Sequence, residues 1–105
     1  MKALNLLLGT ACMASIALAQ AAETLTVATV NNADMIRMQR LSKTFEQQNP
    51  DIKLNWVVLE ENVLRQRLTT DIATNGGQFD VMTIGMYEAP IWAEKGGLTE
   101  MDQLP

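Results

Sequence analysis

The chain has 105 residues, 48% of them hydrophobic and 19% charged, and its formal net charge at pH 7 is −4. This length and composition fit one small globular unit. The chain is acidic and its Lys and Arg residues are scattered, so it lacks the basic patch that binding to nucleic acid or anionic lipid requires. We therefore expect no nucleic-acid partner.

Residues 1–21 have the features of a secretory signal peptide. Lys2 gives a basic start, an apolar run follows, and 19–21 place small residues at the two positions that a signal peptidase reads. Cleavage after residue 21 would leave 22–105 as the mature chain. The alternative is a retained membrane anchor, but polar residues interrupt the apolar run, so cleavage is favoured.

After the signal, segments typical of strands and helices alternate. β-branched, alternating runs predict the first two strands, and apolar residues at helical spacing follow each of them. The pair Gly76-Gly77 then precedes a short apolar run that Gly85 closes, which predicts a third strand buried on both faces of a sheet. The expected order is strand 25–30, helix 35–48, strand 52–58, helix from 60–62 to 75, strand 78–84 and a short helix around 90–93.

Each long helix carries an apolar stripe that we expect to face the sheet. Arg65 and Asp71 lie off the stripe of the second helix. We interpret Trp56 and Trp92 as core residues rather than as platforms for sugar stacking. Asn75 with the following glycines predicts a left-handed end to the second helix. The stripes are Met38, Leu41 and Phe45 in the first helix and Leu64, Leu68 and Ile72 in the second.

This alternation predicts an α/β fold, because right-handed crossovers produce a parallel sheet with flanking helices. In such a sheet, ligands bind beyond the carboxyl ends of the strands, so the loops that follow the strands share one rim. Amides and carboxylates there can bond hydroxyl groups, and a tyrosine ring can cover the apolar face of a sugar or polyol. The candidate ligand-binding residues are Asn31, Asn32, Asp34, Glu60, Tyr87 and Glu88.

Each candidate also has a structural interpretation, as a helix cap or as a solvated loop residue. For Asn32 and Asp34, and for the nearby Asn62, capping is favoured over ligand binding, since each can accept a backbone N–H. For Tyr87 and Glu88 the two interpretations have equal weight.

Catalysis has little support from the residues present. The chain has no histidine, and its one cysteine, Cys12, lies in the segment expected to be removed. Common sets of base, nucleophile and zinc ligands are therefore absent from the mature sequence, and we expect no metal and no cofactor. Glu60 and Glu61 are adjacent at a helix start, so their side chains diverge, whereas a glycosidase needs two carboxyl groups that face each other. Glu60 is closer to the strand end and is the better candidate for a ligand contact.

Separate motifs along the chain resemble one protein family. They are the exported start, the strand that runs into Val30-Asn31-Asn32, and the segments 45–53, 75–81 and 93–98. Together they resemble the N-terminal part of an extracellular solute-binding protein of a carbohydrate ABC importer. Residues 27–35 and 56–72 are similar to its sorbitol/mannitol (polyol) branch.

The resemblance implies two α/β lobes that close like a hinge on a sugar or polyol and then dock on a membrane permease, with no reaction on the ligand. It places ligand contacts at Asn31 or Asn32, at Glu60, and at Tyr87 or its neighbour. Family chains are far longer, so residues 22–105 would be an incomplete N-terminal lobe, the partial first lobe of a two-lobed periplasmic binding protein. A periplasmic monomer is expected, and a fragment of this kind would be inactive alone, binding ligand weakly or not at all.

Two other classes of function remain open. One is a small exported α/β enzyme that works without histidine or cysteine. The other is a membrane-anchored scaffold that keeps its first 21 residues. Within the binding class, a receptor for iron or for anions is disfavoured, because the chain has one tyrosine and no histidine.

Overall fold

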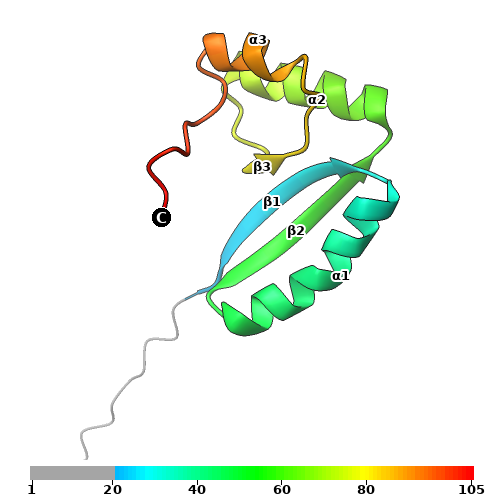
Figure 1. The fold of residues 1–105 in the computed structure, drawn as a ribbon, viewed down its shortest axis with the longest axis vertical. Helices are drawn as coiled ribbons and strands as arrows, with labels where there is room; N and C mark the ends of the chain where they lie inside the picture. The colour runs from blue at the N-terminus through cyan, green and yellow to red at the C-terminus, as the bar shows by residue number, and fades with distance from the viewer. Residues whose placement is uncertain (1–20) are drawn as a thin grey trace, which may run out of the picture.

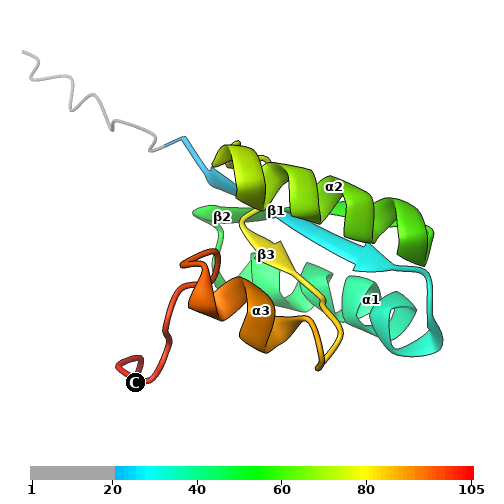
Figure 2. The same cartoon turned by 90° about the horizontal axis from the view of Figure 1, so that it is seen from above.

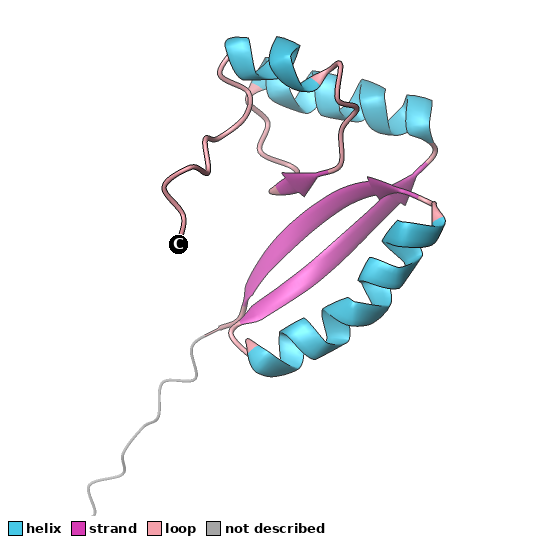
Figure 3. Cartoon of the chain, viewed as in Figure 1, coloured by secondary structure: helices cyan, strands magenta, loops and turns pink. Residues whose placement is uncertain are grey.

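The computed structural model describes residues 21–105, so the predicted signal peptide lies outside the described residues except for Ala21. A three-stranded parallel sheet with flanking helices confirms the predicted α/β class (Figures 1 and 3). No helix in this part of the chain is long and apolar enough to cross a membrane. The elements are β1 (Glu23–Val30), α1 (Ala33–Gln48), β2 (Ile52–Leu59), α2 (Glu61–Thr74), β3 (Val81–Met82) and α3 (Ala89–Glu94).

β1 is the central strand of the sheet, whose order is β2-β1-β3. It pairs with β2 in parallel along its whole length, residues 23–30 opposite residues 52–59. Its other edge pairs with β3, so the middle of β1 is covered on both sides and on both faces. The residues buried there are Val27, Ala28 and Thr29.

The third strand is shorter and more exposed than the sequence predicts. In place of a run at 78–84 buried on both faces, β3 is two residues long and lies at the edge of the sheet, where Val81 is 49% exposed. An apolar run indicates a strand, but burial on both faces depends on neighbouring elements. Among residues 21–105 only β1 pairs with β3. The doubly buried position belongs to β1 instead.

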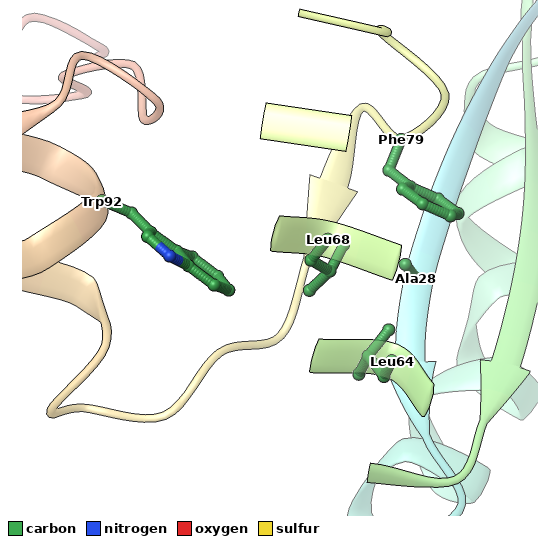
Figure 4. Packing of buried hydrophobic residues seen from close by; sticks show 5 residues of the cluster. All are labelled: Ala28, Leu64, Leu68, Phe79 and Trp92. Atoms are coloured by element: carbon green, nitrogen blue, oxygen red, sulfur yellow. The ribbon is translucent and has the colours of Figure 1, made fainter. Parts of the chain in front are cut away.

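The helices form two layers around the sheet. α2 and α3 lie side by side over one face, and α1 covers the other (Figures 1 and 2). The core cluster lies under α2 and α3, where Leu68 is 1% exposed and Trp92 points from α3 toward it (Figure 4). This confirms the predicted stripe on α2 and the core role of Trp92. The buried members of the cluster are Ala28, Leu64, Leu68, Phe79 and Trp92.

The predicted buried face of α1 is wrong. Met38, Leu41 and Phe45 are 48%, 56% and 39% exposed, and the residue of α1 that is buried is Ser42. Ser42 lies against β2, where the half-buried Trp56 donates a hydrogen bond from Nε1 to its Oγ at 3.2 Å. A small serine lets the helix pack closely beside the large indole, and this turns the apolar stripe toward solvent.

α2 ends as predicted, in a left-handed residue. Asn75 has φ 51° and ψ 42°, and its backbone N–H bonds to the carbonyl of Ile72 at 3.3 Å. After glycine, asparagine is among the residues that best tolerate this conformation, because its short polar side chain can hydrogen-bond locally.

Asn75→Ala is therefore expected to lower the free energy of unfolding by about 1 kcal/mol, because alanine is strained at this φ and ψ. Asn75→Gly is expected to change it by less than about 0.5 kcal/mol, since glycine adopts the conformation freely. Urea denaturation followed by circular dichroism measures both changes. Equal losses in the two variants would contradict this account of the cap.

Candidate functional site

The connections that follow the three strands meet at one rim of the sheet, as predicted. Two hollows open there. The first, which we call the rim pocket, has a volume of about 330 Å³ and lies between α2 and the connection from β3 to α3. The second, the strand-end groove, follows β1 and β2 and has a volume of about 760 Å³. The polar lining residues are Asn32, Glu61, Arg65, Thr83 and Glu88 in the rim pocket, and Asn31, Asn32, Glu60 and Glu61 in the groove.

The loop after β1 brings two of its three candidates to the rim. Asn32 is the N-cap of α1, as predicted, and its Oδ1 accepts a hydrogen bond from the N–H of Met35 at 2.8 Å. Asn31 is exposed and lines the strand-end groove. Asp34 lines neither hollow, and it is not the cap, because it already lies in the first turn of α1 and pairs with Arg37 at 3.8 Å.

The loop after β2 uses its first acid to cap a helix. Glu60 is the N-cap of α2, and its Oε2 accepts hydrogen bonds from the N–H groups of Asn62 at 3.0 Å and Val63 at 3.3 Å. A carboxylate also suits the positive end of the helix dipole. The capping role predicted for Asn62 is therefore wrong. Glu61, the acid judged the weaker candidate, lines both hollows.

The loop after β3 is held by an ion-pair network centred on Arg65. Its Nη2 donates to Tyr87 Oη at 3.0 Å and to Glu61 Oε1 at 3.3 Å, and its Nε forms an ion pair with Glu88 Oε1. The other oxygen of Glu88 accepts from the N–H of Gly85 at 3.2 Å. The adjacent carboxylate of Glu88, with smaller contributions from Tyr87 and Glu61, raises the pKa of Arg65, which therefore stays cationic.

Arg65 is one of the rim residues that the sequence analysis missed, together with Glu61 and Thr83, and it was placed only as lying off the apolar stripe. One signal was available: Glu61 and Arg65 stand four residues apart at a helix start, the spacing of a helical ion pair. The contacts with Tyr87 and Glu88 cross 22 and 23 positions of sequence, and no local pattern indicates them.

The rim offers hydrogen-bond donors and acceptors at close spacing. Carboxylates accept from hydroxyl groups, amides do both, and the ring of Tyr87, which is 67% exposed, adds an apolar face. Within residues 21–105 no group of three or more His, Cys, Asp or Glu is placed to hold a metal ion. The arrangement suits recognition of a neutral solute rich in hydroxyl groups.

Comparison with known proteins agrees with this chemistry. A family model described as bacterial extracellular solute-binding protein matches residues 13–105, which is most of the chain. The chain belongs to this family.

One relative of this solute-binding protein is named as a mannitol-binding protein, and another was solved with D-mannitol bound. The chain is 72% identical over 98 residues to the mannitol-binding protein of Pseudomonas aeruginosa PAO1, a match that covers 93% of this chain and 22% of the relative. A crystal structure of an ABC transporter solute-binding protein from Agrobacterium vitis S4 with bound D-mannitol is 69% identical, with a TM-score of 0.68, and the match covers 71% of this chain and 18% of that one.

This solute-binding protein chain thus spans about a fifth of the length of the relatives that it matches. Its three-stranded sheet and flanking helices match part of a periplasmic binding protein fold.

Proposed function

We propose that this chain is part of the substrate-binding component of an ABC importer for polyols, mannitol among them. The observation that carries the proposal is the high identity to a mannitol-binding protein and to a protein solved with D-mannitol. The rim adds physical support, because it gathers polar groups suited to hydroxyl recognition around one pocket.

The proposed ligand contacts come from all three connections of the rim. Asn31 is exposed beside the groove, and Tyr87 and Glu88 lie where β3 leads into α3. Asn32 caps with Oδ1 and keeps its Nδ2 as a donor for a ligand. Glu60 caps with Oε2, and its Oε1, which accepts from Asn62 Nδ2 at 3.4 Å, has a further lone pair for a ligand hydroxyl. Asp34 lines neither hollow and its contact is with Arg37 on α1, so it is not part of the proposal. Tyr87 also lines neither hollow, but it is kept because it bonds Arg65, which lines the rim pocket. Glu61 is added to the predicted set, because it lines both hollows.

The proposed mechanism is differential binding rather than catalysis. The solute binds to this rim and to a second lobe, and so stabilises the closed arrangement of the two lobes. A membrane permease then recognises the closed state. A ligand can shift the equilibrium only by its difference in affinity for the two states. For this reason one rim by itself is expected to bind a polyol weakly.

The proposal includes export to the periplasm and removal of residues 1–21. Mass spectrometry of the exported protein is expected to give Ala22 as the first residue, because 19–21 fit the specificity of a signal peptidase. A product that retains the first 21 residues would favour the membrane-anchored scaffold instead.

Ligand binding can be tested on the chain by titrating a ¹⁵N-labelled sample with D-mannitol, sorbitol and maltose. We expect weak, saturable shifts with the two polyols, confined to amides of the rim, because polar groups of the three connections line the two adjoining hollows there. Shifts spread evenly over the chain, or no response at the rim at any polyol concentration, would contradict polyol binding by this rim. Tight binding would contradict the need for a second lobe.

Two asparagine variants serve as a matched pair for this titration. Asn31→Ala removes an exposed amide that lines the strand-end groove, and Asn55→Ala removes an exposed amide on β2 that lines neither hollow. Asn31→Ala is expected to weaken the response to mannitol, and Asn55→Ala to leave it unchanged. The reverse result would place the binding site elsewhere.

A further inference from the structure

Arg65 joins two elements of the rim that are remote in sequence. It lies near the start of α2, where Glu61 holds one side of its guanidinium, and it reaches Tyr87 and Glu88 in the connection from β3 to α3. The side chain of Glu88 is 13% exposed, so its charge needs a partner, and Arg65 supplies one. The planar guanidinium presents five donors in a fixed geometry, which lets one residue bond several acceptors at once.

The connection itself is a tight turn built around Gly85. The carbonyl of Gly85 accepts hydrogen bonds from the N–H groups of Glu88 at 3.0 Å and Ala89 at 3.2 Å. A Cβ at Gly85 would lie 3.2 Å from Cε1 of Tyr87 and 3.3 Å from Oε2 of Glu88. The turn is therefore packed against the same two side chains that Arg65 holds.

The direction of the hydrogen bond to Tyr87 has a chemical consequence. An arginine side chain has donors only, so Tyr87 Oη is the acceptor in its bond with Arg65. The phenolic O–H proton is then directed to a different partner. Tyr87 Oη donates to no group within residues 21–105, and the side chain is 67% exposed, so this proton is accessible to solvent or to a ligand.

We propose that Arg65 is a positioning residue for solute recognition: it holds the turn 85–88 against α2 and sets the Tyr87 hydroxyl as a hydrogen-bond donor toward an oxygen of the polyol. The second half of this statement rests on the proposed function. The first half does not, because it concerns contacts within the chain.

The positioning role can be read without any ligand, because Tyr87 is the only tyrosine of the chain and gives one set of ring signals. In a sample with ¹³C-labelled tyrosine, Arg65→Met is expected to shift these signals and to increase ring mobility, together with shifts of the Gly85 and Glu88 amides. Arg65→Lys keeps the charge, but a single ammonium group cannot replace the several donors of the planar guanidinium. It is therefore expected to give the same changes in weaker form. It also serves as the working variant if Arg65→Met does not fold.

Arg37→Met is the matched control, since it removes an arginine whose side chain is 75% exposed and whose ion pair lies on α1. It is expected to leave the Tyr87 ring signals unchanged. Ring signals that stay unchanged in Arg65→Met and Arg65→Lys would overturn the positioning role, and so would equal changes in Arg37→Met.

The ligand half is tested by coupling between two substitutions. Arg65→Lys and Tyr87→Phe are each expected to weaken D-mannitol binding roughly three- to tenfold, the range for the loss of one hydrogen bond. If Arg65 acts through the tyrosine hydroxyl, the double variant is expected to bind about as weakly as Tyr87→Phe alone. If the loss of affinity in the double variant equals the product of the two single losses, this half is overturned. Absence of mannitol binding in the unmodified chain would contradict polyol binding by a lone rim and overturn this half, and the ring signals would still decide the first.

Discussion

Leu68→Ala is expected to lower the free energy of unfolding by about 2–5 kcal/mol, the usual cost of cutting a fully buried leucine back to alanine. Leu68 is 1% exposed and belongs to the cluster that joins β1, α2 and α3. It lies between Ala28 and Trp92 (Figure 4). Side chains that face solvent therefore cannot move in to fill the cavity that its truncation leaves. Urea denaturation followed by circular dichroism measures the change.

Leu41→Ala is the matched control for this experiment. This substitution makes the same chemical change on α1, where Leu41 is 56% exposed. It is therefore expected to alter the free energy of unfolding by no more than about 0.5 kcal/mol. Comparable losses at the two leucines would contradict the assignment of the core to the layer of α2 and α3. They would support the face of α1 that the sequence analysis predicted.

The contrast between α1 and α2 shows how far periodicity predicts packing. Spacing of four residues at Leu64 and Leu68 correctly predicted both the helix and its buried face. On α1 the helix was predicted correctly but the face was not. The side that faces the sheet is selected by the fit of Ser42 beside Trp56, a tertiary contact across 14 residues of sequence. A polar residue at the centre of a helix–sheet contact carries no hydrophobic signal.

The rim was predictable for a topological reason, and its internal contacts were not. A parallel sheet places the loops that follow its strands on one edge, whatever residues those loops contain. Which polar residue caps a helix depends on backbone angles: Asn32 has the extended φ −120° and ψ 169° of an N-cap, and Asp34 is already helical. The network of Arg65 depends on the position of the turn after β3, which no local pattern sets.

Asp71→Ala is expected to lower the free energy of unfolding by about 2–4 kcal/mol, since a buried carboxylate that accepts several N–H bonds leaves them unsatisfied when removed. Asp71 lies off the apolar stripe, as predicted, yet is only 6% exposed. Its Oδ1 and Oδ2 accept from Gln78 N at 3.0 and 3.1 Å, and Oδ2 also accepts from Phe79 N at 3.3 Å. These bonds set the path from α2 into β3. Loss of the carboxylate therefore also loosens the core residue Phe79.

Two further variants separate this role from a general effect of charge. Asp102→Ala removes an exposed carboxylate near the end of the described chain and is expected to change stability by no more than about 0.5 kcal/mol. Gly76→Ala leaves Asp71 in place, but its new Cβ would collide with Oδ1 of that carboxylate and push it off the backbone N–H groups. A loss in Gly76→Ala of the same order as in Asp71→Ala is the expected result. If Gly76→Ala were neutral while Asp71→Ala destabilised, the effect of Asp71 would not come from these backbone bonds.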